Sequence, residues 1–281
     1  MKPLAKGLVL GALAGGSLLV SPSVTAGPWA AGKGRSYTKI TYSHLRSETL
    51  VSPDGTSFDI PRFTKDDVDI FAAYGLSSSV TVLANIPLTR SSSLRDEPDE
   101  LSRETGFGDL AFGAQLQLGR RGPWVFAVRG AVQVPTGDET RAQGLLPTGS
   151  GIWEGQAVLS LGRSFGRRGQ IFGFVEAGPG FRGGGLRDGV VYSAQVGFSP
   201  ARRVVFVVNV RGVEPYSHEA PEVARGSFSG VGDRVTYLTL GPTAIVGLTK
   251  NVGLQADWDG AFRSRNLAKG PTFRVGISYT K

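Results

Sequence analysis

The stretch "GFGDLAFGAQLQLGRRGPWVFAVRGAVQVPTGD", from Gly106 to Asp138, sorts its side chains by parity on both sides of a short break. One parity is apolar: Leu110, Phe112, Ala114, Leu116, Leu118, Trp124, Phe126, Val128, Val132 and Val134. The other carries the polar residues Asp109, Gln115, Gln117, Arg129 and Gln133. Successive side chains of a β-strand point to opposite faces, so this period of two predicts two strands. The question it raises is which medium each face meets.

The composition excludes several classes of protein. The chain has 281 residues, of which 40% are hydrophobic and none is cysteine. Without cysteine there is no disulfide framework and no thiolate metal site, and two histidines and one methionine argue against other transition-metal sites. The net charge of +8 comes with no basic helix or aromatic-interleaved single-strand platform, so we expect no nucleic-acid partner.

The first residues have the pattern of an export signal. Lys2 and Lys6 precede an apolar run over 7–20, and small residues lead to Ala26. We therefore expect a signal peptide over 1–26 and one β-barrel domain over 27–281. Glycine, proline or charge interrupts every later apolar stretch, so a membrane would have to be crossed by strands.

The rest of the chain divides into about twelve candidate strands. They cover 36–46, 67–75, 79–89, 107–118, 124–135, 152–162, 170–180, 189–198, 204–214, 234–248, 252–263 and 272–280. Pro242 predicts a bulge or register change in the tenth.

The connections alternate in length. Those after the even-numbered strands are short, such as "LSS", "SPARR" and "TKN", whereas most others are long, including "SSSLRDEPDELSRE" and "EPYSHEAPEVARGSFSGVG". Short turns on one rim and long loops on the other predict a transmembrane antiparallel up-and-down β-barrel, with short periplasmic turns and longer extracellular loops. A soluble secreted barrel or sandwich, whose apolar face is its core, is the alternative that alternation alone leaves open.

In such a barrel the apolar parity contacts lipid and the opposite parity faces the lumen. Residues near strand ends that suit interfacial aromatic girdles are Trp124, Trp153, Tyr192, Phe198, Phe262 and Tyr279. The residues expected to line the lumen are Asp69, Asp109, Gln115, Gln117, Arg129, Gln133, Glu154, Gln156, Gln195, Asn209, Arg211, Gln255, Asp257, Asp259 and Arg274. Lys39, Glu176 and Arg263 are assigned to the same face.

Two motifs carry a resemblance to a known family. "GFGD" at 106–109 opens one alternating strand, and "PTGD" at 135–138 follows the next. In this the chain resembles the meta-pathway phenol-degradation type of outer-membrane proteins, most clearly over 66–165. The resemblance implies an outer-membrane barrel that helps small, often aromatic, compounds to cross.

The expected lumen holds charges of both signs, which packing of the interior explains more simply, with a solute path lined by these groups as the alternative. Twelve strands lie between filled eight-stranded barrels and open porins, so a narrow or partly obstructed pore is expected. The short turns carry basic residues and no acid, and they could attract anionic lipid headgroups: Arg120, Arg121, Arg163, Arg167, Arg168, Arg202, Arg203 and Lys250.

Catalysis finds little support in the sequence. His44 neighbours Ser43 in one strand, so the two side chains point to opposite faces and cannot couple directly. His218 lies in a long loop beside Glu219, and "GPWAAGKG" at 27–34 has Gly34 where a phosphate loop needs Ser or Thr. We expect no catalytic residue, no cofactor and no metal.

The sequence thus predicts an outer-membrane barrel that passes small solutes, hydrophobic or aromatic ones among them. Its expected partners are outer-membrane lipids and, during biogenesis, the barrel-assembly machinery. The alternative is a structural or adhesive barrel that binds a partner through its extracellular loops, and an outer-membrane lipid hydrolase is the least favoured reading.

Overall fold

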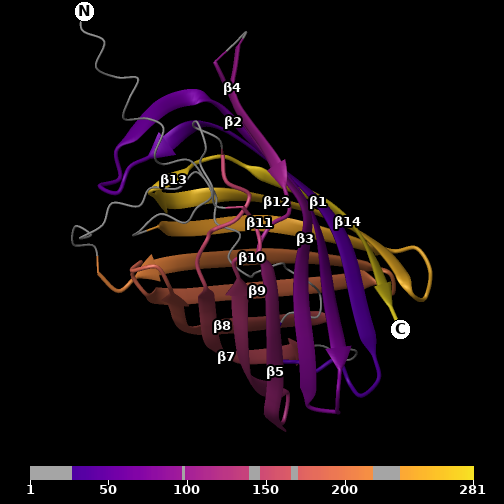
Figure 1. Cartoon of the computed structure of the whole chain (residues 1–281). Coiled ribbons are helices and arrows are strands. Elements are labelled where there is room, and N and C mark those ends of the chain that lie inside the picture. The colour runs from indigo at the N-terminus through magenta and orange to yellow at the C-terminus, as the bar shows by residue number, and fades with distance from the viewer. Residues whose placement is uncertain (1–26, 97–98, 139–145, 166–169, 218–234) are drawn as a thin grey trace, which may run out of the picture.

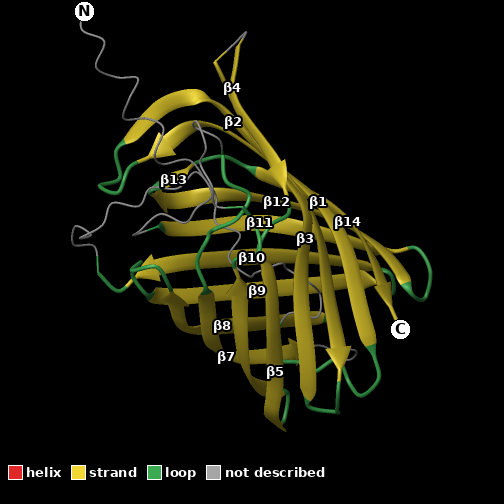
Figure 2. Ribbon diagram, viewed as in Figure 1, coloured by secondary structure: helices red, strands yellow, loops and turns green. Residues whose placement is uncertain are grey.

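The computed structural model describes residues 27–96, 99–138, 146–165, 170–217 and 235–281. The expected signal peptide and His218 lie outside these ranges. The described chain consists of strands that curve into a barrel, with loops between them (Figures 1 and 2). Among these residues, no helix is long and apolar enough to cross a bilayer.

Twelve of the described strands form a closed antiparallel barrel. β1 pairs with β2 on one side and with β14 on the other, which closes the sheet and leaves no edge strand in the wall. The wall strands are β1 (Ser36–Val51), β2 (Ser57–Gly75), β3 (Val80–Asp96), β5 (Leu110–Arg121), β6 (Trp124–Val134), β7 (Glu154–Phe165), β8 (Ile171–Arg182), β9 (Gly189–Ala201), β10 (Val204–Pro215), β11 (Thr236–Gly247), β12 (Val252–Arg265) and β14 (Thr272–Thr280). Two shorter strands extend it, β4 (Asp99–Gly106) beside β3 and β13 (Leu267–Ala268) beside β1.

The barrel confirms the fold predicted from the two-residue period. Phe112, Leu116 and Trp124 are exposed on the outer wall, whereas Gln115 and Arg129, of the opposite parity, are buried. Exposed apolar side chains beside buried polar ones invert the arrangement of a soluble protein. The apolar parity is therefore the outer face, as a barrel in lipid requires.

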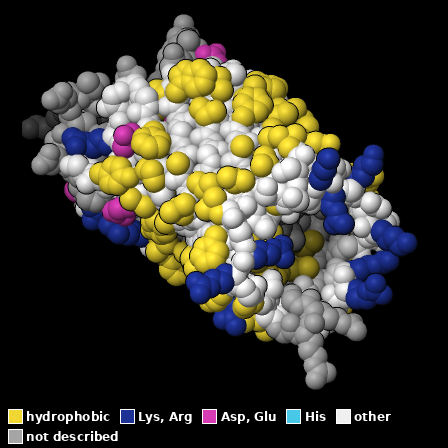
Figure 3. All heavy atoms as spheres, turned by 90° about the horizontal axis from the view of Figure 1, so that it is seen from below, with side chains coloured by type: hydrophobic (Ala, Val, Ile, Leu, Met, Phe, Trp, Pro, Cys, Tyr) yellow, Lys and Arg dark blue, Asp and Glu magenta, His cyan; other side chains and the backbone are white. Residues whose placement is uncertain are grey.

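The outer surface has an apolar belt and a basic rim. Figure 3 shows hydrophobic side chains over the wall, and lysines and arginines around the hollow at one end. At the short-turn end, Arg163 lies over the rings of Trp124 and Phe165, with its guanidinium carbon 5.0 and 4.6 Å from the ring centroids. Of the expected girdle residues, Trp124, Trp153, Phe198, Phe262 and Tyr279 are exposed. Tyr192 is half-buried, with its ring over Gly212.

The long-loop end corrects several predicted boundaries. β1 and β2 extend to Val51 and back to Ser57, and the expected loop over 91–104 is largely a hairpin of β3 and β4 (Figure 1). These extensions carry polar residues on both faces, so they lack the apolar alternation by which the other strands were found. At "GFGD" the prediction began too early, because Phe107–Asp109 are irregular and β5 begins at Leu110.

A shift of register moves one predicted lumen residue. β11 and β12 change register between Leu238 and Thr239, whereas Pro242 pairs in register with Val208. Beyond this bulge Ser264 is buried, and Arg263 is exposed and forms an ion pair with Glu214 at 3.3 Å. Arg263 therefore faces outward, contrary to the prediction, because one extra residue in a strand reverses the parity of those after it.

Candidate functional site

The candidate site is the interior of the barrel. Among the fifteen residues expected to line the lumen, Asp69, Gln117, Arg211 and Arg274 are half-buried and the other eleven are buried. None is exposed on the outer wall. Their part in lining a solute path stays a prediction, since it depends on flux rather than on position.

A network on one side of the interior centres on Glu176. Arg129 Nη2 donates to Glu176 Oε1 at 2.7 Å, and Ser193 Oγ donates to the same oxygen at 3.0 Å. Ser160 Oγ donates to Glu176 Oε2 at 3.1 Å. The strand register explains the meeting, because Glu176 lies directly opposite Ser160 on β7 and Ser193 on β9. A buried ion pair with both carboxylate oxygens satisfied is the arrangement that a low-dielectric interior tolerates.

A second network lies on β10, β11, β12 and β14. Asn209 Nδ2 donates to Thr243 Oγ1 at 2.9 Å, and Thr243 in turn donates to Asp257. Gln255 Nε2 also donates to Asp257 Oδ2, at 2.8 Å. Beside them, Arg274 is ion-paired with Asp259. The sequence predicted all of these residues except Thr243, whose hydroxyl sits between two of them.

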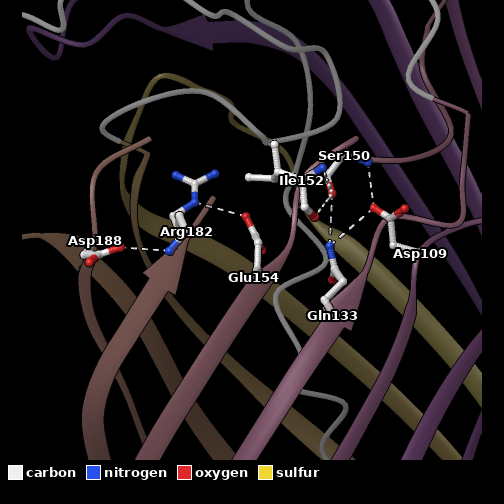
Figure 4. Close-up of polar contacts among 7 residues, drawn as sticks. All are labelled: Asp109, Gln133, Ser150, Ile152, Glu154, Arg182 and Asp188. Atoms are coloured by element: carbon white, nitrogen blue, oxygen red, sulfur yellow. Dashed lines mark hydrogen bonds and ion pairs between the residues drawn. The ribbon is translucent and has the colours of Figure 1, made fainter. Parts of the chain in front are cut away.

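At the long-loop end, a third network holds the described parts of the connection between β6 and β7, residues 135–138 and 146–153, which we call the inward-folded segment (Figure 4). Asp109 accepts hydrogen bonds from the backbone amides of Ser150, at 2.6 Å, and Gly137, at 3.0 Å, and from Gln133 Nε2 at 3.3 Å. Nearby, Arg182 Nε donates to Glu154 Oε1 at 3.0 Å. Asp109 is therefore a structural clasp for the connection between β6 and β7.

The same end contains an ionic cluster that the sequence prediction missed. Asp67 accepts from Arg90 Nε at 3.0 Å and pairs with Lys65 Nζ at 3.2 Å, and all three side chains are buried. Arg90 Nη1 also donates to the carbonyl of Thr148 at 2.9 Å. The alternation of Lys65, Asp67 and Asp69 is a local signal that extends the predicted strand 67–75 back to Lys65.

A hydrophobic cluster lies beyond these ions at the long-loop end. Phe63 is 0% exposed and packs with residues from the extended strands and from the inward-folded segment. The cluster comprises Leu50, Ile60, Phe63, Leu94, Leu146 and Ala268, with Leu45 against it. We call it the long-loop core.

At the short-turn end, the segment Gly27–Gly32 enters the barrel ahead of β1, and we call it the N-terminal segment. Its backbone amides are bonded to the wall: Ala30 N donates to Gln117 Oε1 at 3.1 Å and Ala31 N to Thr81 Oγ1 at 3.0 Å. Gln115 Nε2 donates to the carbonyl of Trp29 at 3.2 Å. Gln115 and Gln117 were predicted to face the lumen, but no role was predicted for the segment they hold.

Aromatic rings and glycines of the wall form the surface against which this segment packs, which we call its seat. Trp29 makes edge-on contacts with Phe172 and Phe174 of β8, at 6.3 and 6.2 Å between ring centroids. A Cβ at Gly162 of β7 would lie 2.5 Å from Pro28, and one at Gly75 of β2 would lie 1.8 Å from the carbonyl oxygen of Gly32. The segment thus crosses the interior between opposite walls, which is the partial obstruction expected of a barrel of this size.

The histidine in the wall is placed away from the interior. His44 Nδ1 lies 2.8 Å from Asp66 Oδ1, and both side chains are more than a third exposed. Tyr42 Oη donates to the same oxygen at 2.5 Å. Ser43 is buried on the opposite face. Ser43 and His44 therefore do not form a nucleophile and base pair.

Three comparisons with known proteins bear on this barrel. The model of the family described as "Putative MetA-pathway of phenol degradation" matches residues 27–171, which is more than half of the chain. A search of the curated proteins found no match.

Among solved structures, the fold is similar to that of the COG4313 outer membrane channel from Pseudomonas putida F1. The TM-score is 0.68 at 16% identity, covering 93% of this chain and 99% of that one. It is also similar to the NanC porin, with a TM-score of 0.55 at 7% identity, covering 86% of this chain and 98% of that one. At these identities the likeness concerns the fold.

Proposed function

The chain belongs to the family described as "Putative MetA-pathway of phenol degradation", and we propose that it is an outer-membrane channel for small hydrophobic or aromatic solutes. Its likeness in fold to an outer membrane channel supports this proposal.

The observation that carries the proposal is the N-terminal segment inside the barrel. An interior that admits a stretch of polypeptide is wider than one filled by its own wall side chains. The segment is held by hydrogen bonds and ring contacts and lies outside the sheet, so its displacement leaves the strand ladder intact. Displacement would widen the short-turn end of the interior by the space that the segment now occupies.

The chemistry of the seat supports an aromatic solute. Phe172 and Phe174 present their rings to the interior, where Trp29 now contacts them. Tyr37 and Phe71 form another ring pair in the interior, with 6.2 Å between centroids. Aromatic rings offset from one another gain stability beyond their buried area, so a small aromatic solute could replace the contacts of Trp29.

Uptake by whole cells tests this proposal, because small aromatic compounds cross simple lipid vesicles unaided. A porin-deficient Gram-negative host producing the full chain should take up a radiolabelled small aromatic compound faster than the same host with an empty vector. Heat-modifiable electrophoretic mobility of the membrane fraction would establish that the barrel is folded. Equal uptake by the two strains, with the barrel folded, would contradict the proposal.

A further inference from the structure

A small cavity lies in the wall of the interior, on the side of β6 to β11. Its polar lining comes from Arg129, Gln156, Glu176, Arg211 and Tyr237. The strand register brings Glu176 of β8, Ser193 of β9 and Arg211 of β10 into one row across the wall. Glu176 lies opposite Ser193, and Ser193 lies opposite Arg211. Two guanidinium groups and one carboxylate give these lining residues a net charge of +1 (2 − 1).

The one carboxylate of this cavity is already saturated with donors. Glu176 accepts from Arg129, Ser160 and Ser193 through both of its oxygens. The two acids of the second network are engaged as well, since Asp259 is bonded to Arg274 and Asp257 to Thr243 and Gln255. The carboxylates of Asp257 and Asp259 therefore already accept hydrogen bonds from Thr243, Gln255 and Arg274 within the second network.

Two donors in the cavity lining have no hydrogen-bond partner in the part of the chain that the structure describes. Arg129 Nε and Gln156 Nε2 are buried, and neither makes a hydrogen bond among the described residues. Arg129 and Gln156 are only 9% and 6% exposed. Buried N–H groups are almost always satisfied by protein, water or ligand, so this pair is suited to an oxygen acceptor. Arg211 has contacts of its own and contributes positive charge to the same lining.

We propose that this cavity binds the carboxylate of a small organic acid. Its two oxygens accept from Arg129 Nε and Gln156 Nε2 and face the charge of Arg211. The cavity has a volume of about 10 Å³, room for about one water molecule, so only the carboxylate enters it, and the apolar part of the acid lies in the barrel interior outside the cavity. The inference deepens the proposed channel function, on which it rests, because it names aromatic acids as the solute class that pauses inside the barrel.

Binding in detergent micelles tests this inference without any measurement of flux. The barrel, purified in detergent from a host that produces the full chain, would be titrated with 4-fluorobenzoate and, separately, with neutral 4-fluorobenzyl alcohol, and followed by fluorine NMR. Charge-assisted hydrogen bonds should make the acid bind about tenfold tighter than the alcohol, or more. Equal binding of the two compounds would overturn the inference.

Two substitutions locate the site. Gln156→Leu and Arg211→Gln should each weaken fluorobenzoate binding and leave the alcohol unaffected, whereas Lys250→Gln, in an exposed short turn, should change neither. Gln156→Glu places a carboxylate beside Arg129 Nε, so it should abolish fluorobenzoate binding while the barrel unfolds at the same or a higher temperature. Unchanged binding in Gln156→Leu and Arg211→Gln would contradict the assignment.

A competing anion separates a carboxylate site from a general one. Inorganic phosphate that displaces fluorobenzoate at matched concentrations would overturn the carboxylate assignment, and failure to displace it supports the assignment. The proposed channel function stands or falls separately. Uptake without acid preference in binding would sink this inference alone, and acid binding without uptake would sink only the channel.

Discussion

The two ends of the barrel are narrowed in different ways. At the long-loop end the narrowing is tied to the sheet, since extended strands carry most of the long-loop core and the ionic cluster of Lys65, Asp67 and Arg90. At the short-turn end it is a separate piece of chain, held by a few side-chain hydrogen bonds and the rings around Trp29. We therefore expect the long-loop core to be lost only when the barrel unfolds, whereas the N-terminal segment should be able to move while the barrel stays folded.

The largest expected effect breaks the long-loop core. Phe63→Ala should lower the free energy of unfolding by about 3–5 kcal/mol, because it leaves a cavity where a fully buried ring had packed. Urea-dependent loss of the heat-modifiable electrophoretic shift would measure it. Phe58→Ala, on the same strand but exposed, is the matched control. Equal losses for the two variants would deny that the long-loop core stabilises the fold.

A smaller effect is expected when the clasp of the inward-folded segment is removed. Asp109→Ala leaves the amides of Gly137 and Ser150 without their acceptor, which should cost about 1–3 kcal/mol of unfolding free energy. Asp188→Ala removes the acceptor of one amide at an exposed site, so it serves as the control. The same urea titration would compare them, and an Asp109 variant as stable as the control would refute the clasp.

At the short-turn end, we expect a substitution to change the permeability of the barrel clearly and its unfolding free energy little, the opposite of the long-loop end. Trp29→Ala removes two ring contacts worth roughly 0.5–1.5 kcal/mol each from the docking of the N-terminal segment. Planar-bilayer conductance should rise while the urea midpoint of the barrel stays unchanged. Trp258→Ala, on the outer wall, should leave conductance as it was. A shifted midpoint with unaltered conductance would make the segment part of the fold.

The smallest effect concerns the outer rim at the short-turn end. Arg163→Gln removes the guanidinium from between Trp124 and Phe165, at a cost of about 0.5–1 kcal/mol in unfolding free energy. Arg202→Gln, in the exposed turn between β9 and β10, is the control. Urea titration in lipid vesicles would compare the two variants. Equal unfolding midpoints would show that the contacts of Arg163 with the two rings do not stabilise the barrel.

The contrast between the two ends also explains what the sequence could predict. Within the lipid belt each strand meets two media, so parity alone separated Phe112 and Trp124 from Gln115 and Arg129. Above the belt the alternation fails, because a register shift between β1 and β2 brings Ile60 and Phe63 into one core although their parities differ. The sequence therefore predicts loops where the strands extend. The bulge that turns Arg263 outward depends on pairing between β11 and β12, which no local pattern encodes.

The N-terminal segment escaped prediction for another reason. "GPWAAG" has no period, and its place in the interior is fixed by glycines distant in sequence, Gly75 and Gly162. One local signal was available, a tryptophan and a proline immediately before the first strand. The sequence could not predict the cavity between β6 and β11 either. Which nitrogens of Arg129 and Gln156 lack a partner among the described residues is known only once the side-chain contacts around Glu176 are known.

A reversible tether tests most directly whether the N-terminal segment controls passage. The chain has no cysteine, so Ala31→Cys combined with Thr81→Cys introduces the one pair, at a site where the backbone nitrogen and the hydroxyl oxygen are 3.0 Å apart. Uptake of the labelled aromatic compound should fall when the pair is oxidised and return when it is reduced, with single-cysteine variants indifferent to both. Uptake that is the same in the oxidised and reduced states would contradict the account.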